Sequence, residues 1–130
     1  MGSLTEAQVS LFKGKNFAAL GTIRPDGTAH VSPVWVDYDG ENVVFNTSRG
    51  RAKEQHLVRD PRVTLTVWSA ENPYEYVEVA GMAELVDEGA IDSINAMAKK
   101  YIDQDVYPWL KPGEQRVIVK VAALKVRGMQ

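Results

Sequence analysis

One stretch of the sequence decides the fold: it reads Phe17-Ala18-Ala19-Leu20-Gly21-Thr22-Ile23-Arg24-Pro25-Asp26-Gly27-Thr28-Ala29-His30-Val31-Ser32-Pro33-Val34-Trp35. From Asn16 onward the side chains alternate with a period of two, which is typical of a β-strand with one buried face. Pro25-Asp26-Gly27 then makes a turn, and a second run follows over 28–38. The stretch therefore predicts an antiparallel hairpin.

Further strands are predicted on the C-terminal side of this hairpin. Asp39-Gly40 is another hairpin signal, and it leads to a third run over 42–46. Strands resume at 62–69 and 75–86, and a last strand covers 115–126. About six antiparallel strands in a meander, with helices inserted between hairpins, predict a mainly β protein of the α+β kind. Closure of the sheet into a small barrel would remove its exposed edges.

Three segments have helical signals. Thr5 and Gln8 form a capping box before the first. The second, 48–59, is polar and basic and ends at Asp60-Pro61, because the residue before a proline avoids helical geometry. Asp87 is the predicted cap of the third. The apolar face of that third helix comprises Ile91, Ile94, Ala98, Tyr101 and Ile102.

Composition excludes several classes of function. The 130 residues form one domain, 1–130, with a formal net charge of -2, which is not typical of a general nucleic-acid or membrane binder. The absence of cysteine excludes disulfides and thiolate sites, and two histidines make a metal centre unexpected. With no secretory signal and no apolar run of about 20 residues, the sequence predicts a cytoplasmic protein.

The segment Asn46-Thr47-Ser48-Arg49-Gly50-Arg51-Ala52-Lys53 carries the clearest chemistry. It leaves a strand and opens a helix, where unpaired N–H groups and the helix dipole favour an anion. Thr47 and Ser48 add hydroxyl donors, while Arg51 and Lys53 add positive charge. The interpretation is a phosphate clamp. In the alternative, Ser48 only caps the helix and the basic residues form a solvated face.

A second feature is the proline in His30-Val31-Ser32-Pro33-Val34-Trp35. Proline cannot donate to a strand ladder, so it indicates an edge strand or a bulge. Such a strand can leave backbone groups free to meet a planar ligand, or the proline can simply protect an edge from aggregation. His30 is a weak acid–base candidate, and no catalytic side chain can be assigned from spacing.

Together these residues resemble the pyridoxamine 5′-phosphate oxidase-like split barrels, and within them the small flavin and deazaflavin oxidoreductases that use coenzyme F420. The likeness is carried by four stretches in order: 17–22, 26–35, 45–53 and 59–63. It implies an FMN-binding-protein-like split β-barrel and a homodimer with two cofactor sites at the subunit interface.

The resemblance also implies roles for residues. Val31, Ser32, Pro33 and Val34 would lie along the flavin or deazaflavin ring, and Thr47, Ser48, Arg51 and Lys53 would hold the phosphate. Trp109, Lys111 and Arg116 are the candidates for contacts that the partner subunit would supply to the site. The tail of the deazaflavin cofactor would seek further cations, among which Lys13, Lys15 and Arg62 are candidates.

Three functions are compatible with this resemblance. Longer members that oxidise pyridoxamine phosphate carry a basic motif near the C-terminus, which the stretch 125–130 does not match. The leading hypothesis is therefore hydride transfer from reduced coenzyme F420 to a conjugated acceptor, such as a quinone, a tetrapyrrole like biliverdin, or another planar enone. The alternatives are an FMN-dependent oxidase or flavin reductase, and a non-enzymatic module that binds a cofactor or haem.

Overall fold

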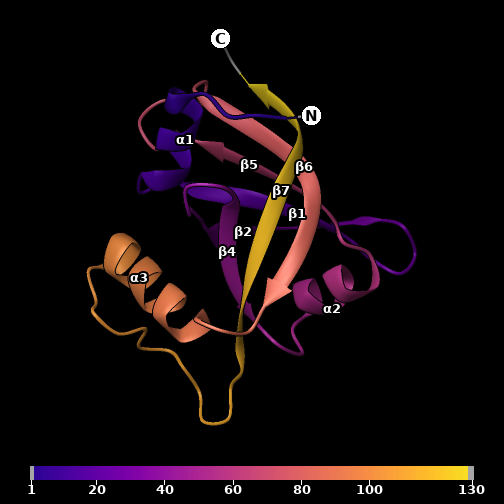
Figure 1. The fold of residues 1–130 in the computed structure, drawn as a ribbon, viewed down its shortest axis with the longest axis vertical. Coiled ribbons are helices and arrows are strands. Elements are labelled where there is room, and N and C mark those ends of the chain that lie inside the picture. The colour runs from indigo at the N-terminus through magenta and orange to yellow at the C-terminus, as the bar shows by residue number, and fades with distance from the viewer. Residues whose placement is uncertain (1, 129–130) are drawn as a thin grey trace.

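A computed structural model describes residues 2–128 as one seven-stranded sheet with three helices (Figure 1). The elements are α1 Glu6–Lys13, β1 Phe17–Ile23, β2 Ala29–Trp35, β3 Asp37–Tyr38, β4 Val43–Ser48, α2 Ala52–Arg59, β5 Arg62–Trp68, β6 Tyr76–Val86, α3 Ala90–Ile102 and β7 Arg116–Gly128. Met1, Met129 and Gln130 lie outside the described residues, so the end of the stretch 125–130 does too. No helix within residues 2–128 is long and apolar enough to cross a membrane.

The sheet is antiparallel throughout and strongly curved. Its strand order is β2-β1-β5-β6-β7-β4-β3, and the long strands β6 and β7 bend across the molecule in Figure 1. A register shift at Ala80/Gly81 increases this bend, and a Cβ on Gly81 would lie 1.9 Å from the Ala122 carbonyl oxygen. The predicted mainly β split barrel is confirmed. Pro33 lies in β2, at one end of the sheet, as an edge-strand proline should.

The alternation in the sequence matches burial in the structure. Ala18 and Leu20 of β1 are fully buried, while Phe17 is 52% exposed. The predicted capping box is present, because the Gln8 amide donates to Thr5 Oγ1 and the Thr5 amide donates to Gln8 Oε1. A main core fills the inside of the sheet, and its larger members include Phe12, Leu20, Val36, Phe45, Leu57, Leu65, Val67 and Val119.

Three local predictions are corrected. The run over 28–38 is interrupted at Val36, which gives β2 and β3 and so a seventh strand. The helix expected from 48 starts only at Ala52, since Ser48 still pairs with β7. The third helix is capped by Gly89 in a left-handed conformation rather than by Asp87, whose carboxylate instead accepts from Arg49.

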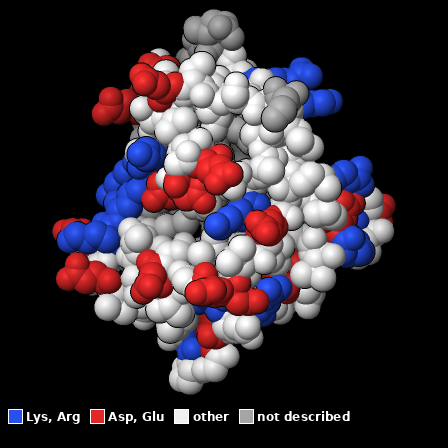
Figure 2. Space-filling view, viewed as in Figure 1, with Lys and Arg blue, Asp and Glu red and all other residues white. Residues whose placement is uncertain are grey.

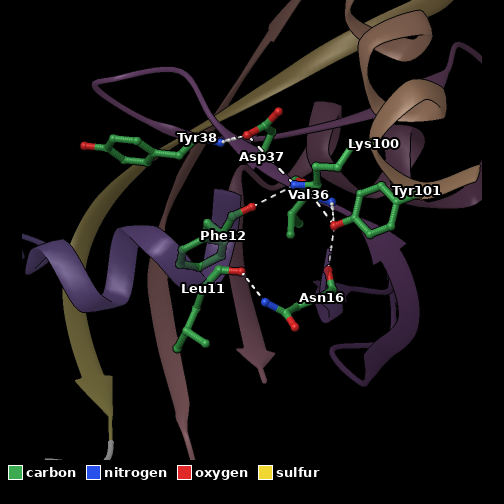
Figure 3. Close-up of polar contacts among 8 residues, drawn as sticks. All are labelled: Leu11, Phe12, Asn16, Val36, Asp37, Tyr38, Lys100 and Tyr101. Carbon is green, nitrogen blue, oxygen red and sulfur yellow. Dashed lines mark hydrogen bonds and ion pairs between the residues drawn. The ribbon is translucent and has the colours of Figure 1, made fainter. Parts of the chain in front are cut away.

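The break at Val36 is held by two side chains of α3 (Figure 3). Lys100 Nζ donates to the carbonyls of Phe12, at 2.9 Å, and Val36, at 2.5 Å. The Tyr101 hydroxyl accepts from the Val36 amide at 3.1 Å and donates to the Asn16 carbonyl at 2.5 Å. Burial raises the pKa of Tyr101 to about 12, so this hydroxyl keeps its proton. The two residues thus join α1, β1 and the β2–β3 junction to α3.

We expect Lys100→Met to destabilise the fold by about 1–3 kcal/mol, because two buried carbonyls lose their donor while the aliphatic stem is kept. Urea unfolding followed by circular dichroism measures this change. The neighbouring Lys99→Met is the matched control: Lys99 is exposed, and within residues 2–128 its ion pairs are those with exposed Asp103 and Asp105, so a change within about 0.5 kcal/mol is expected. Equal effects of the two substitutions would contradict the role assigned to Lys100.

Candidate functional site

The predicted clamp residues border a hollow of about 240 Å³ between β2, β4, α3 and the loop before β7. We call it the basic hollow. Its lining comprises Phe17, Pro33, Val34, Trp35, Asn46, Arg51, Lys53, Ile94, Tyr107, Trp109 and Arg116. Acidic and basic side chains are intermixed over the face shown in Figure 2. The positive charge of the hollow comes from three of its lining side chains, Arg51, Lys53 and Arg116.

The three cations Arg51, Lys53 and Arg116 reach the hollow from two elements, α2 and β7. Arg51 is the N-cap of α2, Lys53 lies in its first turn, and Arg116 begins β7. Burial lowers the pKa of Lys53, and the positive charges of Arg51 and Arg116 lower it further. Like charges held together in a half-buried space are unfavourable unless an anion joins them. The arrangement therefore suits a phosphate.

Arg116 is held rigidly at the base of the hollow. Its Nε donates to Asn46 Oδ1 at 2.8 Å, and its Nη1 donates to Glu114 Oε2 at 2.7 Å and to Ser48 Oγ at 3.0 Å. Burial alone would raise the pKa of Glu114, but hydrogen bonds from Ser48 and Arg116 outweigh it and lower this pKa to about 2. The guanidinium carbon also lies 5.0 Å from the centre of the Tyr107 ring.

Aromatic side chains form the other wall of the hollow. Trp35 stacks on Tyr101, with ring centres 5.2 Å apart and planes 4° from parallel. Tyr107 meets Trp35 edge-on at 6.1 Å, and Trp109 lies 5.7 Å from Tyr107. Trp109 is 59% exposed, so it forms the outer rim. Flat apolar walls beside convergent cations suit a planar ligand that carries an anionic group.

The structure brings together four of the eight predicted cofactor residues: Pro33, Val34, Arg51 and Lys53. Val31 instead borders a second hollow, which is lined by residues of β1, β2, β5, β6 and β7. Ser32 Oγ is a buried polar atom without a hydrogen-bond partner among the described residues.

The two predicted hydroxyl donors of the clamp do not line the hollow. Thr47 is buried within β4, and the Ser48 hydroxyl donates to Glu114. Trp109 and Arg116, which were candidates for contacts supplied by the partner subunit, line this chain's own hollow. Lys111 does not line it, and its backbone amide donates to Glu114 Oε1.

Several contributors were missed by the sequence reasoning. Asn46 both accepts from Arg116 and donates to the Ala90 carbonyl at 2.9 Å, so it ties the hollow to α3. Glu114 orients Arg116 from two residues away. Trp35 lies in the predicted hairpin and directly follows Val34, but its role as a wall of the basic hollow is evident only from its stacking on Tyr101. The alternation of β4 could have indicated that Asn46 and Ser48 share a face.

The second hollow is larger and apolar, at about 640 Å³. We call it the apolar hollow. Its lining is mostly small and apolar, with three threonines and two cations, and comes from β1, β2, β5, β6 and β7: Ala19, Gly21, Thr22, Ile23, Ala29, Val31, Arg62, Val63, Thr64, Thr66, Ala80, Gly81, Met82, Leu124 and Lys125. Val31, Met82 and Leu124 are each more than 40% exposed. Such a concave apolar face is typical of an interface with another molecule.

Comparison with known proteins agrees with this geometry. The sequence profile of the pyridoxamine 5′-phosphate oxidase family matches residues 4–130. The chain belongs to that family. It is therefore a split barrel of the pyridoxamine 5′-phosphate oxidase kind, a group of oxidoreductases that bind flavin-type cofactors.

Three solved structures illustrate the likeness of this family member. An F420 reductase is 29% identical, with 95% of this chain and 98% of that chain covered and a TM-score of 0.84. A conserved hypothetical protein from Mycobacterium tuberculosis is 23% identical, with coverages of 96% and 84% and a TM-score of 0.74. General Stress Protein 26 from Bacillus anthracis is 18% identical, with coverages of 93% and 89% and a TM-score of 0.71. The last two show the fold alone.

A buried histidine of α2, His56, connects this helix to the sheet. His56 Nδ1 lies 2.9 Å from the Thr22 hydroxyl, and the His30 ring is 5.3 Å away, edge to face. Burial lowers the pKa of His56 from its ordinary value of 6.5, and the charges of His30, Arg59 and Arg24 lower it further. The folded protein therefore favours neutral His56.

We expect stability to fall as the pH is lowered through 6.5, because the unfolded chain then binds a proton that folded His56 resists. The slope attributable to one proton is at most about 1.4 kcal/mol per pH unit. Free energies of unfolding at pH 7.5 and 5.5 measure it. His56→Asn should flatten this dependence, and an unchanged slope in that variant would contradict the assignment.

Proposed function

We propose that this chain is an oxidoreductase that binds reduced coenzyme F420 in the basic hollow. It would transfer hydride to a conjugated organic acceptor, such as a quinone, a tetrapyrrole or another planar enone. The observation that carries the proposal is the convergence of Arg51, Lys53 and Arg116 beside aromatic walls. The similarity to an F420 reductase supports the choice of cofactor.

The cations fit a phosphate group in different ways. Arg51 is exposed and has no ion pair among residues 2–128, so its fork can grip two phosphate oxygens. Lys53 is half-buried, and an incoming anion would relieve the repulsion that lowers its pKa. The Arg116 guanidinium already donates to Glu114. It would therefore attract the phosphate by its positive charge rather than by a two-point hydrogen bond. Arg51 and Lys53 are therefore the proposed phosphate ligands.

The ring would lie against Pro33 and Val34, with Trp35, Tyr107 and Trp109 closing the remaining sides. Because β2 is the last strand at its end of the sheet, part of its backbone can face a ligand. When bound, coenzyme F420 supplies the hydride, so the protein needs to orient the ring, hold the phosphate and exclude water. This assignment agrees with a hollow whose lining residues include no cysteine, serine, threonine, histidine or carboxylate.

FMN is the alternative cofactor, because it also carries a phosphate on a planar tricyclic ring. The match to the pyridoxamine 5′-phosphate oxidase family supports FMN as directly as it supports coenzyme F420. An FMN-loaded chain would act as an oxidase or a flavin reductase.

We further propose that two copies of the chain associate through the apolar hollow. A basic hollow of about 240 Å³ is small compared with ligand pockets of roughly 300–1,000 Å³, so one chain alone gives an incomplete site. Val31 borders the apolar hollow while Pro33 and Val34 border the basic one. Because β2 contributes residues to both hollows, a partner chain bound at the apolar hollow would lie next to the cofactor.

The first test titrates reduced coenzyme F420, and separately FMN, into the protein and follows fluorescence. The Arg51→Ala, Lys53→Ala double variant should bind about 100-fold more weakly, because two charge-assisted contacts of roughly 1.5 kcal/mol each are lost. Arg127→Ala, an exposed residue near the far end of β7, is the control and should bind normally.

If the protein binds FMN tightly and does not bind coenzyme F420, FMN is the cofactor. Equal affinities of the double variant and the wild type would refute the phosphate site itself.

The second test measures the molecular mass in solution. Met82→Glu together with Leu124→Glu should convert a dimer into monomers at micromolar concentration, because two carboxylates per chain would be buried without partners. Ile91→Glu, on an exposed position of α3, should leave the dimer intact. Analytical ultracentrifugation separates these outcomes, and a wild-type monomer at all concentrations would contradict the proposal.

A further inference from the structure

The turn that leads from β4 into α2 is held by a buried glutamate. Glu54 lies in the first turn of α2 and is 6% exposed. Its Oε1 accepts from the Gly50 amide at 2.9 Å, and its Oε2 accepts from Arg49 Nη1 at 3.0 Å. Gly50 has a φ of 91°, a left-handed conformation that glycine adopts without steric strain. The Glu54 carboxylate therefore fixes the chain in this turn.

Arg49 joins the same turn to the segment between β6 and α3. Its Nε and Nη2 each donate to one oxygen of Asp87 at 3.0 Å, which makes a two-point contact. Hydrogen bonds to Asp87 and Glu54 raise the pKa of Arg49, and those from Arg49 lower the pKa of Asp87. The Arg49 backbone amide donates to the Gln115 carbonyl at 2.8 Å. All three nitrogens of this guanidinium group are therefore occupied.

The cations of this segment thus have two different environments. Arg51 and Lys53 line the basic hollow, whereas Arg49 and Glu54 do not. Arg51 forms no ion pair among residues 2–128, and its side chain does not cap α2, so the first amides of the helix are left for another acceptor. The acidic groups are neutralised by Arg49, which leaves Arg51 and Lys53 available to a ligand.

We propose that Glu54 and Arg49 are positioning residues for the phosphate of the cofactor. They fix the turn at Gly50, and through this turn they set the direction in which Arg51 and Lys53 enter the basic hollow. Neither of the two would touch the phosphate itself. The inference rests on the proposed function, but it applies equally to coenzyme F420 and to FMN, because both carry a phosphate.

The negative charge of Glu54 separates this role from a simple electrostatic effect. A carboxylate in the first turn of α2, next to Lys53 in the chain, repels an incoming anion. If charge alone mattered, removal of this carboxylate would strengthen phosphate binding. If Glu54 positions the turn, its removal weakens phosphate binding, because Arg51 and Lys53 must then be ordered when the ligand binds. The two explanations predict changes of opposite sign.

Three substitutions divide the contributions further. Glu54→Ala removes both hydrogen bonds of the carboxylate, whereas Glu54→Gln changes the charge equally and keeps a side-chain carbonyl that can accept from Gly50. Arg49→Lys keeps the charge of the chain, but a lysine cannot reproduce the planar contact with Glu54 and both oxygens of Asp87.

The experiment measures how much the phosphate group adds to the affinity. FMN is compared with riboflavin, and the 5′-phosphate of the F420 deazaflavin is compared with its phosphate-free form, so the members of each pair differ only in the phosphate. Lys120→Gln is the control, because Lys120 is a partly exposed cation paired with Asp39 at 4.0 Å and lines neither hollow. Fluorescence titrations give the dissociation constants, and thermal unfolding shows whether each variant is folded in the assay.

We expect Glu54→Ala to bind the phosphate-bearing ligands about tenfold more weakly, and Glu54→Gln and Arg49→Lys about threefold more weakly. The phosphate-free ligands should bind all three variants as they bind the wild type, and Lys120→Gln should resemble the wild type throughout.

Unchanged or tighter phosphate binding by Glu54→Ala, or equal losses for both members of a pair, would overturn the positioning role. If Glu54→Ala does not fold, Arg49→Lys decides by the same criteria. A wild type that binds the two members of each pair equally would refute the proposed phosphate site instead.

Discussion

The hydrogen bonds between α3 and the backbone at Val36 are the constraint on which the rest of the structure depends. The strand predicted over 28–38 is interrupted at Val36, which leaves the Val36 amide and carbonyl without strand partners. The Tyr101 hydroxyl accepts from that amide, and Lys100 Nζ donates to that carbonyl. The chain can then turn from β2 into β3. Because Tyr101 also stacks on Trp35, the same contact places one wall of the basic hollow. Packing and site geometry are therefore set by one pair of neighbouring residues.

The positive charges that converge at the basic hollow repel one another in the protein alone. Arg51, Lys53 and Arg116 converge where repulsion and burial lower the pKa of Lys53, although the overall charge is only -2. Glu114 compensates for one of the three cations, and in doing so it holds Arg116 in a single orientation. The remaining excess can be neutralised by an anionic ligand, which would stabilise the protein as it binds.

Much of the fold could be predicted from sequence because burial imposes local periods. Ala18 and Leu20 alternate with exposed neighbours, and the capping box of α1 depends on residues three apart. The break at Val36 could not be predicted, because its cause is a hydroxyl 65 positions away. For the candidate site, position after a strand correctly suggested that Arg51 and Lys53 lie together. The same reasoning could not reveal that the Ser48 hydroxyl is occupied by Glu114, since that partner arrives from another loop.

The central claim is that the basic hollow receives the phosphate of a planar redox cofactor. A crystal structure of the chain with coenzyme F420 tests it most directly. We expect phosphate oxygens within hydrogen-bonding distance of Arg51 and Lys53, and the deazaflavin ring against Pro33 and Val34. A phosphate bound elsewhere, or a ring that lies on the apolar hollow away from these residues, would refute the proposed site.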